Sequence, residues 1–372
     1  MRAPCAQPYL PPEFAGVSGP LRIAFVSGDS RRWRKQLLAA KYLKMRLEGV
    51  IYPDVYCLAL MLSNSFDFLV EGEKVARGKY DLILAELQSS ETQLQYLESL
   101  VEAADPPVAV IAGPPAILSR DLTDSKLRRV KRILQSTRYV WAYAPELKTF
   151  CDGLIGCERA SVIPWPYDFA ATRRLGTRVN VQKKDANPGH RILVQVPMSF
   201  HDIVQNHPFV LKAILLDLWQ ELPAALRPSL AFHTFIYNAE DRARYQSTGF
   251  AAGLPFVLQR KLGYRAFVRF LAGCDGVVNL TAGSILGRVT FLSAALGRLG
   301  IFSNNSQLNA RLYPNSQVGM FDTVRLRELL RAMLLGLVEG ATDERLLPSL
   351  EAAAEIGNFA ANQERLRQML AL

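Results

Sequence analysis

Short apolar runs alternate with amphipathic segments along most of the chain. The first run, Leu21–Val26, precedes a turn at Gly28 and a segment, Trp33–Leu47, whose apolar residues recur at helical spacing. The order then repeats, with strands predicted at 80–85, 108–112, 139–142 and 160–164, and helices at 93–104, 124–135 and 145–151. Runs without polar alternation are typical of parallel strands that helices cover on both faces. The pattern predicts an α/β domain over residues 1–172.

Residues 173–190 interrupt this alternation. The stretch is polar and basic and contains Asn, Pro and Gly, which indicates a linker. After it, strands are predicted at 191–196, 229–236, 255–258, 276–280 and 300–302, and helices at 208–222, 264–272, 284–296 and 323–338. This predicts a second α/β domain over 191–348, followed by a terminal helix over 349–372. The expected fold class is α/β, with two Rossmann-like doubly wound domains facing a cleft.

Composition narrows the class of protein. The 372 residues fit two domains, and 49% hydrophobic with 21% charged residues exclude a disordered chain. There is no run of about 18 uncharged apolar residues and no signal-peptide pattern, so we expect a cytoplasmic protein. The five cysteines form no metal-binding pattern, so we expect free thiols and no metal.

The net charge of +10 is unevenly distributed. Arg31–Arg46 contains seven basic residues and no acid, and a second basic cluster lies within 126–132. Such segments attract anions, and we expect peripheral contact with an anionic membrane surface. A solvated basic helix face is the alternative. We do not expect nucleic-acid binding, because no basic motif interleaved with aromatic residues is present.

Four short stretches match the motifs of a known enzyme family. Residues 160–168 read ASVIPWPYD, 204–213 read VQNHPFVLKA, 267–279 end in CDGVVN, and 294–297 read AALG. Here the chain resembles the GT-B glycosyltransferases of family 4 (group 1), and its C-terminal helix resembles the one that crosses back to the first domain. The resemblance covers nearly the whole chain. It implies a GT-B fold, a nucleotide-sugar donor as substrate, no separate cofactor, and a glycan or lipid-linked acceptor.

The positions that should bind the donor depart from this family. The family has an arginine and a lysine that face the diphosphate, whereas here the region reads Pro197–His201 and the lysine is Gln205. The two glutamates of the family align near Ser284 and Leu292 of this chain, and no acid occurs here from 276 to 312. We therefore expect an atypical donor site. A glycosyltransferase-like subunit that has lost catalysis, and serves binding or assembly, is the second interpretation; phosphosugar epimerases and phosphorylases share the architecture.

A helix start offers a replacement for the missing cations. Backbone N–H groups there can bind a diphosphate without a metal, and an arginine can add a bidentate contact. The segment 281–288 lies between a predicted strand and helix, and its candidate donor-binding residues are Thr281, Gly283, Ser284, Gly287 and Arg288. Arg260 and Lys261, after the strand at 255–258, are further candidates. A plain turn with a surface arginine, and a solvated basic pair, are the alternatives.

Three side chains are candidates for acid–base chemistry. Asp29 follows the turn at Gly28, which itself could contact the ligand, and could act as a base or bind an acceptor hydroxyl. Alternatively, Asp29 caps the next helix. Glu86 is a second acid at a strand end, and His201 lies in the first loop of the second domain. A structural role is the alternative for both. The turn lacks G-x-G-x-x-G spacing, so we expect no nicotinamide site.

Overall fold

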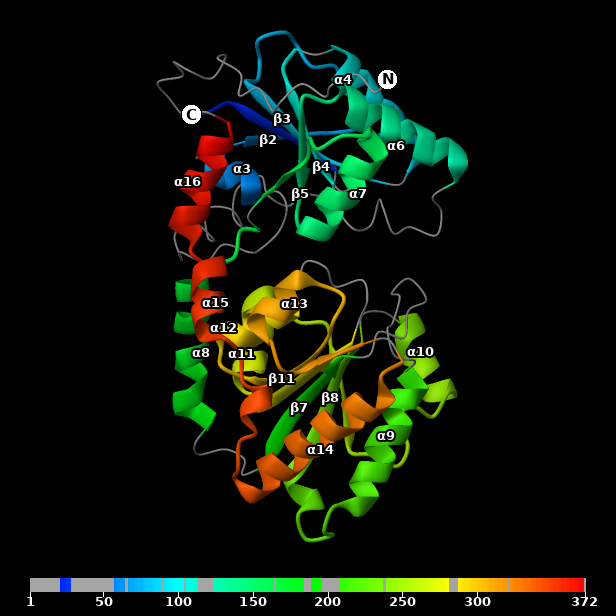
Figure 1. Ribbon diagram of the computed structural model, residues 1–372, viewed down its shortest axis with the longest axis vertical. Coiled ribbons are helices and arrows are strands. Elements are labelled where there is room, and N and C mark those ends of the chain that lie inside the picture. Colours follow the sequence, from blue (N-terminus) through cyan, green and yellow to red (C-terminus); the bar gives the residue numbers. More distant parts are fainter. Residues whose placement is uncertain are drawn as a thin grey trace. The chain divides into compact units, whose positions relative to one another are not determined.

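Two compact units make up the chain. The computed structural model describes residues 21–27, 57–63, 66–88, 90–103, 105–112, 123–163, 165–183, 189–195, 208–236, 239–280, 287–319 and 321–370. One unit is Met1–Asp168 together with Gly357–Leu372, and the other is Phe169–Ile356. Each contains a six-stranded sheet flanked by helices (Figure 1). The predicted α/β class with two Rossmann-like domains is confirmed.

The first unit has the strand order β2-β1-β3-β4-β5-β6, and its paired strands are all parallel. The strands are β1 (Ile23–Val26), β2 (Phe66–Leu69), β3 (Leu82–Glu86), β4 (Val108–Ala112), β5 (Tyr139–Ala142) and β6 (Ser161–Val162). Every residue of β1 and β4 is buried. This double-sided burial explains why these strands are continuous apolar runs in the sequence.

The helices among the described residues of the first unit form two groups. Helices α4 (Glu91–Ala103), α6 (Asp124–Ser136) and α7 (Pro145–Ile155) pack side by side. Helix α16 (Phe359–Met369) packs on α3 (Cys57–Leu62), where Gln363 Nε2 donates to the Met61 carbonyl over 2.9 Å. Helix α6 carries the second basic cluster, and its Arg129 and Arg132 form ion pairs with Glu98 of α4. The first basic segment, Arg31–Arg46, lies outside the described residues.

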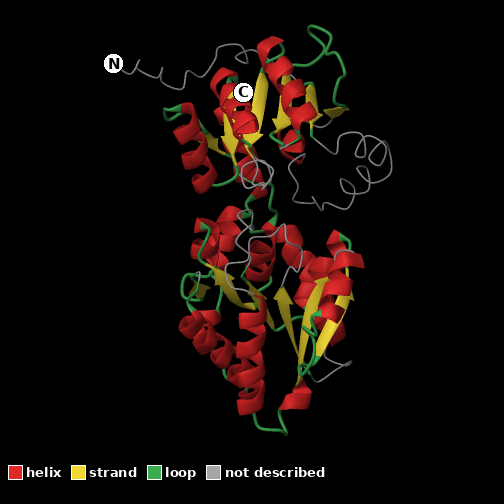
Figure 2. Cartoon of the chain, turned by 90° about the vertical axis from the view of Figure 1, so that its right-hand side faces the viewer, coloured by secondary structure: helices red, strands yellow, loops and turns green. Residues whose placement is uncertain are grey.

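The second unit repeats the parallel arrangement with the strand order β12-β11-β10-β7-β8-β9. Its strands are β7 (His190–Gln195), β8 (Leu230–Ile236), β9 (Phe256–Arg260), β10 (Gly276–Asn279), β11 (Leu299–Ser303) and β12 (Gln317–Val318). Helices α8 (Phe169–Lys183), α11 (Tyr264–Ala272), α12 (Arg288–Ala295) and α15 (Leu350–Ile356) pack together. Helices α9 (Pro208–Glu221) and α14 (Thr323–Glu339) form a separate layer (Figure 1). Figure 2 shows the strands of this sheet side by side. Short helices α10 (Ala239–Ser247) and α13 (Gln307–Leu312) and the 3₁₀ turns Arg227–Ser229 and Glu344–Leu346 complete the unit.

Most of the stretch predicted as a linker is a helix. Residues 173–183 belong to α8, which is part of the second unit. Arg173 Nη1 donates to the Ala295 carbonyl at the end of α12 over 3.3 Å. A Cβ on Gly176 would lie 2.3 Å from Leu296 Cδ2, so α8 and α12 approach closely. The sequence hid this helix because small residues, rather than a stripe of large apolar ones, make its closest contact.

Two further sequence predictions differ from the structure. The terminal helix predicted over 349–372 is two helices, α15 and α16, and Asn358 Oδ1 caps α16 by accepting from Ala361 N. Cys157 is disulfide-bonded, contrary to the prediction of free thiols, whereas Cys151 and Cys274 are free and buried. No helix among the described residues combines the length and apolar character that crossing a membrane requires.

Candidate functional site

The second sheet reverses its strand order between β7 and β10. The chain proceeds from β7 to β8 in one direction and from β10 to β11 in the other. Such a reversal opens a crevice at the carboxyl ends of the two strands, which is where α/β sheets bind ligands. Gln195 and Asn279, the last residues of β7 and β10, are register partners at this point. Two residues with amide side chains therefore end the two strands at the switch point.

Sequence reasoning did not select Gln195 or Asn279. Asn279 is only 2% exposed, although it ends an otherwise apolar strand. The signal in the sequence that could have identified these two residues is a polar residue at the end of each of two apolar strands. Which two strands are neighbours depends on the sheet order, and the sequence pattern does not define that order.

Helix α12 is the next described helix after β10, one of the two strands at this switch point. Its N-cap, Gly287, has φ of 55°, in the left-handed region that glycine tolerates best. A Cβ there would lie 2.3 Å from Leu308 Cδ2, so the close packing of α13 also favours glycine. Arg288 is the first residue of α12 and is half-buried. Helix α12 thus follows β10, and a helix N-terminus carries the positive end of the helix dipole, which favours anions.

A buried polar network joins the first turn of α12 to the neighbouring segments. Thr290 Oγ1 donates to Asn309 Oδ1 over 2.8 Å, and Asn309 Nδ2 donates to the Ser303 carbonyl over 2.8 Å. Ser306 caps α13 by accepting from Leu308 N and Asn309 N. Thr290, Ser303 and Asn309 are each at most 1% exposed. The network connects α12, the end of β11 and the start of α13, and so fixes the direction of α12.

Arg298 binds carbonyls at the C-terminal ends of α12 and α11. Its guanidinium donates to the Leu296 and Cys274 carbonyls over 2.9 and 3.0 Å, after α12 and α11 respectively. Burial lowers the pKa of Arg298. A cation at helix C-termini is favourable for the helix dipole, which assigns Arg298 a structural role away from the strand carboxyl ends.

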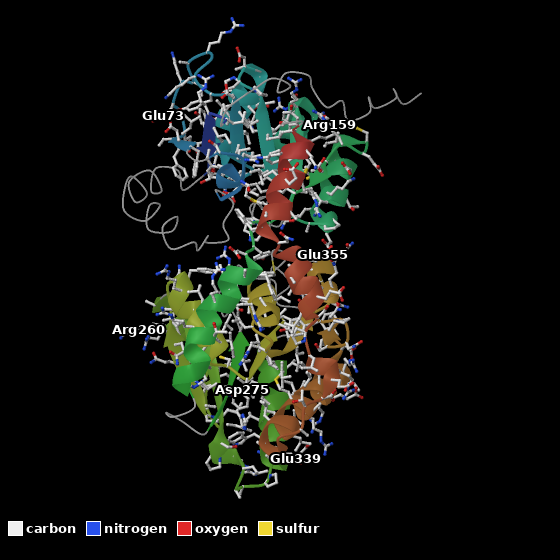
Figure 3. The ribbon with its side chains drawn as sticks, turned by 90° about the vertical axis from the view of Figure 1, so that its left-hand side faces the viewer. Glu73, Arg159, Arg260, Asp275, Glu339 and Glu355 are labelled. Atoms are coloured by element: carbon white, nitrogen blue, oxygen red, sulfur yellow. The ribbon has the colours of Figure 1, made fainter. Side chains whose placement is uncertain are left out.

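The structure places Arg260 and Lys261 at the edge of the second sheet. Arg260, which is labelled in Figure 3, ends β9 and is exposed. Lys261 is exposed as well. Strands β8 and β7 separate β9 from β10, a distance of about 14 Å across the sheet. These two cations therefore follow the edge strand β9, three strands away from β10, which α12 follows.

The first sheet has its own switch point, between β1 and β3. Strand β1 pairs with β2 on one side and with β3 on the other. Ser27, which follows β1, and Glu86, which ends β3, come to the carboxyl edge together because Val26 and Ala85 are register partners. Ser27 is buried and Glu86 is half-buried. The candidate acid Glu86 thus lies where a doubly wound sheet binds ligands.

The remaining candidates fall outside the described residues: Gly28, Asp29, His201, Thr281, Gly283 and Ser284. Their roles stay predictions. Within the described part of the chain, no group of three or more His, Cys, Asp or Glu residues could hold a metal ion.

Comparisons with solved structures identify the fold. Sucrose-phosphate synthase from Thermosynechococcus elongatus aligns with a TM-score of 0.60 and 12% identity, covering 94% of this chain and 98% of that chain. HepE from Anabaena, in complex with UDP-glucose, aligns with a TM-score of 0.55 and 15% identity, covering 94% and 98%. A UDP-forming trehalose-phosphate synthase from Burkholderia xenovorans aligns with a TM-score of 0.55 and 11% identity, covering 78% of this chain and 73% of that chain.

This chain therefore has the two-domain, Rossmann-like fold of GT-B glycosyltransferases. No family model matches the sequence, and no curated protein matches it either. Membership of family 4 stays a prediction.

Proposed function

We propose that this protein is a glycosyltransferase that transfers a sugar from a nucleotide-sugar donor to a glycan or lipid-linked acceptor. What supports the proposal is the GT-B fold, with a second unit in which α12 follows β10, one of the two strands at the switch point. HepE, which shares the fold, was solved with UDP-glucose and also with UDP and glucose. UDP-sugars are therefore the first donors to test.

The proposed donor site holds the diphosphate by backbone amides rather than by a pair of basic side chains. The first N–H groups of α12 and the guanidinium of Arg288 supply positive charge to the leaving diphosphate as the glycosidic bond breaks. Gln195 and Asn279 can donate amide hydrogens to phosphate or sugar oxygens. No carboxylate occurs from 276 to 312, so sugar hydroxyls in this site would be recognised by neutral groups.

The proposed acceptor side lies in the first unit. Glu86, at the end of β3, would accept a hydroxyl proton or orient the acceptor. Asp29, and His201 of the second unit, are the alternative acid–base residues. The donor is a substrate, so the proposal requires no separate cofactor.

The experiment is a turnover assay with purified protein, a panel of UDP-, GDP- and ADP-sugars, and glycan or lipid-linked acceptors. Release of nucleoside diphosphate that depends on the acceptor supports the proposal. Nucleotide-sugar binding without turnover across the panel would favour the second interpretation, a catalytically inactive binding or assembly subunit.

A further inference from the structure

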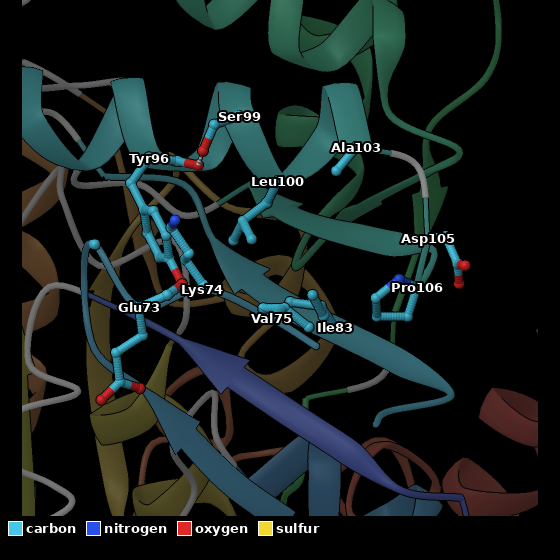
Figure 4. Close-up of a pocket in the computed structure, with 11 residues that line it drawn as sticks. Glu73, Lys74, Val75, Ile83, Tyr96, Ser99, Leu100, Ala103, Asp105 and Pro106 are labelled. Atoms are coloured by element: carbon cyan, nitrogen blue, oxygen red, sulfur yellow. Dashed lines mark hydrogen bonds between the residues drawn. The ribbon is translucent and has the colours of Figure 1, made fainter. Parts of the chain in front are cut away.

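A hollow of about 430 Å³ lies in the first unit, away from the carboxyl edge of its sheet. It is bounded by α4, the loop that joins β2 to β3, and the segment before β4 (Figure 4). Ile83 lines it from the second position of β3, whereas Glu86 ends the same strand about 10 Å farther along. The hollow is therefore distinct from the acceptor side proposed above, and the inference below does not depend on that function.

The floor of the hollow is apolar. Ile83, Leu100 and Pro106 are buried, and Val75 is half-buried beside them. Figure 4 shows Leu100 directed from α4 toward Val75 and Ile83. The volume lies within the range of about 300–1,000 Å³ that small-molecule sites occupy, and such sites combine an apolar lining with few polar groups.

Most polar groups around the hollow are engaged with the protein. Tyr96 Oη donates to the Glu73 carbonyl over 2.7 Å. The Glu73 carboxylate accepts from Val70 N over 3.2 Å and is directed away from the hollow. Asp105 Oδ2 accepts from Arg77 Nε over 2.9 Å. Both acids that line the hollow therefore already have bonding partners.

Lys74 differs from these groups. It lines the hollow, its side chain is exposed, and it forms no ion pair with any described residue. Among the described residues that line the hollow, Lys74 is the one cation. An apolar floor with one ammonium group at its margin matches a ligand that has an apolar body and one negative charge.

We propose that this hollow binds an amphipathic monoanion of the medium-chain carboxylate class. The alkyl chain would cover Val75, Ile83 and Leu100, and the carboxylate would pair with the ammonium group of Lys74.

The first test is calorimetric titration of the full chain with butanoate, hexanoate and octanoate below their aggregation limits. Each added methylene should tighten binding about fourfold while the chain still fits the hollow. Lys74→Gln should weaken octanoate binding about threefold, as expected for an exposed ion pair, and should leave octanol binding unchanged. Lys131→Gln, an exposed cation of α6 outside the hollow, is the matched control.

The second test fills the hollow. Ala103 lies at its margin at the end of α4, and Gln95 is exposed on the same helix but does not line the hollow. Ala103→Trp should abolish octanoate binding, and Gln95→Trp should not. Melting temperatures of both variants near that of the parent establish that they are folded. Absence of octanoate binding to the parent, equal affinity in the two tryptophan variants, or affinity independent of chain length would each overturn the proposal.

Discussion

At Gly287, backbone conformation and packing both oppose any side chain. A non-glycine residue with φ of 55° is disfavoured by about 1–2 kcal/mol, and its Cβ would also contact Leu308. Gly297 has a similar φ of 67° with no atom within 4 Å of an added Cβ, so it isolates the conformational cost. We predict that Gly287→Ala lowers the free energy of unfolding by more than Gly297→Ala does. Urea unfolding of both variants measures the difference, and equal losses would show that Leu308 moves aside without cost.

His233 predicts a pH dependence of stability. Burial, and secondarily the charge of Arg191, lowers its pKa, and Gln259 Nε2 lies 3.0 Å from its Nδ1. Below about pH 6.5 the unfolded state takes up a proton on His233 more readily than the folded state does. The contribution of neutral His233 to the free energy of unfolding is therefore complete above about pH 6.5 and is lost as the pH falls. Between pH 7.5 and 5.5 the parent should lose more stability than His233→Gln. A larger loss in the variant would contradict this assignment.

Individual site residues were predictable where their environment is local in sequence. Gly287 and Arg288 stand at the start of the helix that follows an apolar strand, and Glu86 ends an apolar run, so these positions follow from the local pattern. Gln195 and Asn279 meet only because β7 and β10 are adjacent. Such a pairing depends on the packing of the whole sheet, and no local motif specifies it.

At the scale of elements, α8 provides a sharp test of helix packing. An alanine in place of a helical glycine normally stabilises by about 0.5–1 kcal/mol, and Gly153 of α7, with no atom within 4 Å of an added Cβ, should show this gain. At Gly176 the added Cβ would meet Leu296 of the α12 C-cap and lie 3.5 Å from Ala272 Cβ. We predict that Gly176→Ala instead destabilises the protein. Thermal unfolding compares the two variants, and a gain at both positions would show that α8 does not pack tightly there.

The elements that were predicted from the sequence are those with a clear local pattern of apolar residues. Strands such as β4 and β5, and helix α11, match their predicted bounds because long buried runs or clear amphipathicity define them. Helix α8 escaped prediction because its close contact with α12 uses Gly176. Strand β12 has only two residues, too few for any period to appear.

At the scale of the whole molecule, the charge of +10 predicts attraction to anionic lipid. Part of the cluster on α6 is neutralised by Glu91 and Glu98, which leaves Arg31–Arg46 as the larger source of charge. We expect the protein to float with anionic vesicles and to detach as salt screens the charges, with a screening length of about 8 Å at 0.15 M. Vesicles of neutral lipid are the control. Equal recovery with both lipids, or indifference to salt, would refute the prediction.

The central claim is that a nucleoside diphosphate binds at the start of α12, and calorimetric titration with UDP tests it most directly. Arg288→Ala should weaken UDP binding by about tenfold to a hundredfold, the range for a hydrogen bond to a charged group. Arg269→Ala, an exposed cation on α11 of the same unit, should leave the affinity unchanged. A parent protein that binds no nucleoside diphosphate, or an Arg288→Ala variant that binds UDP as tightly as the parent, would contradict the account.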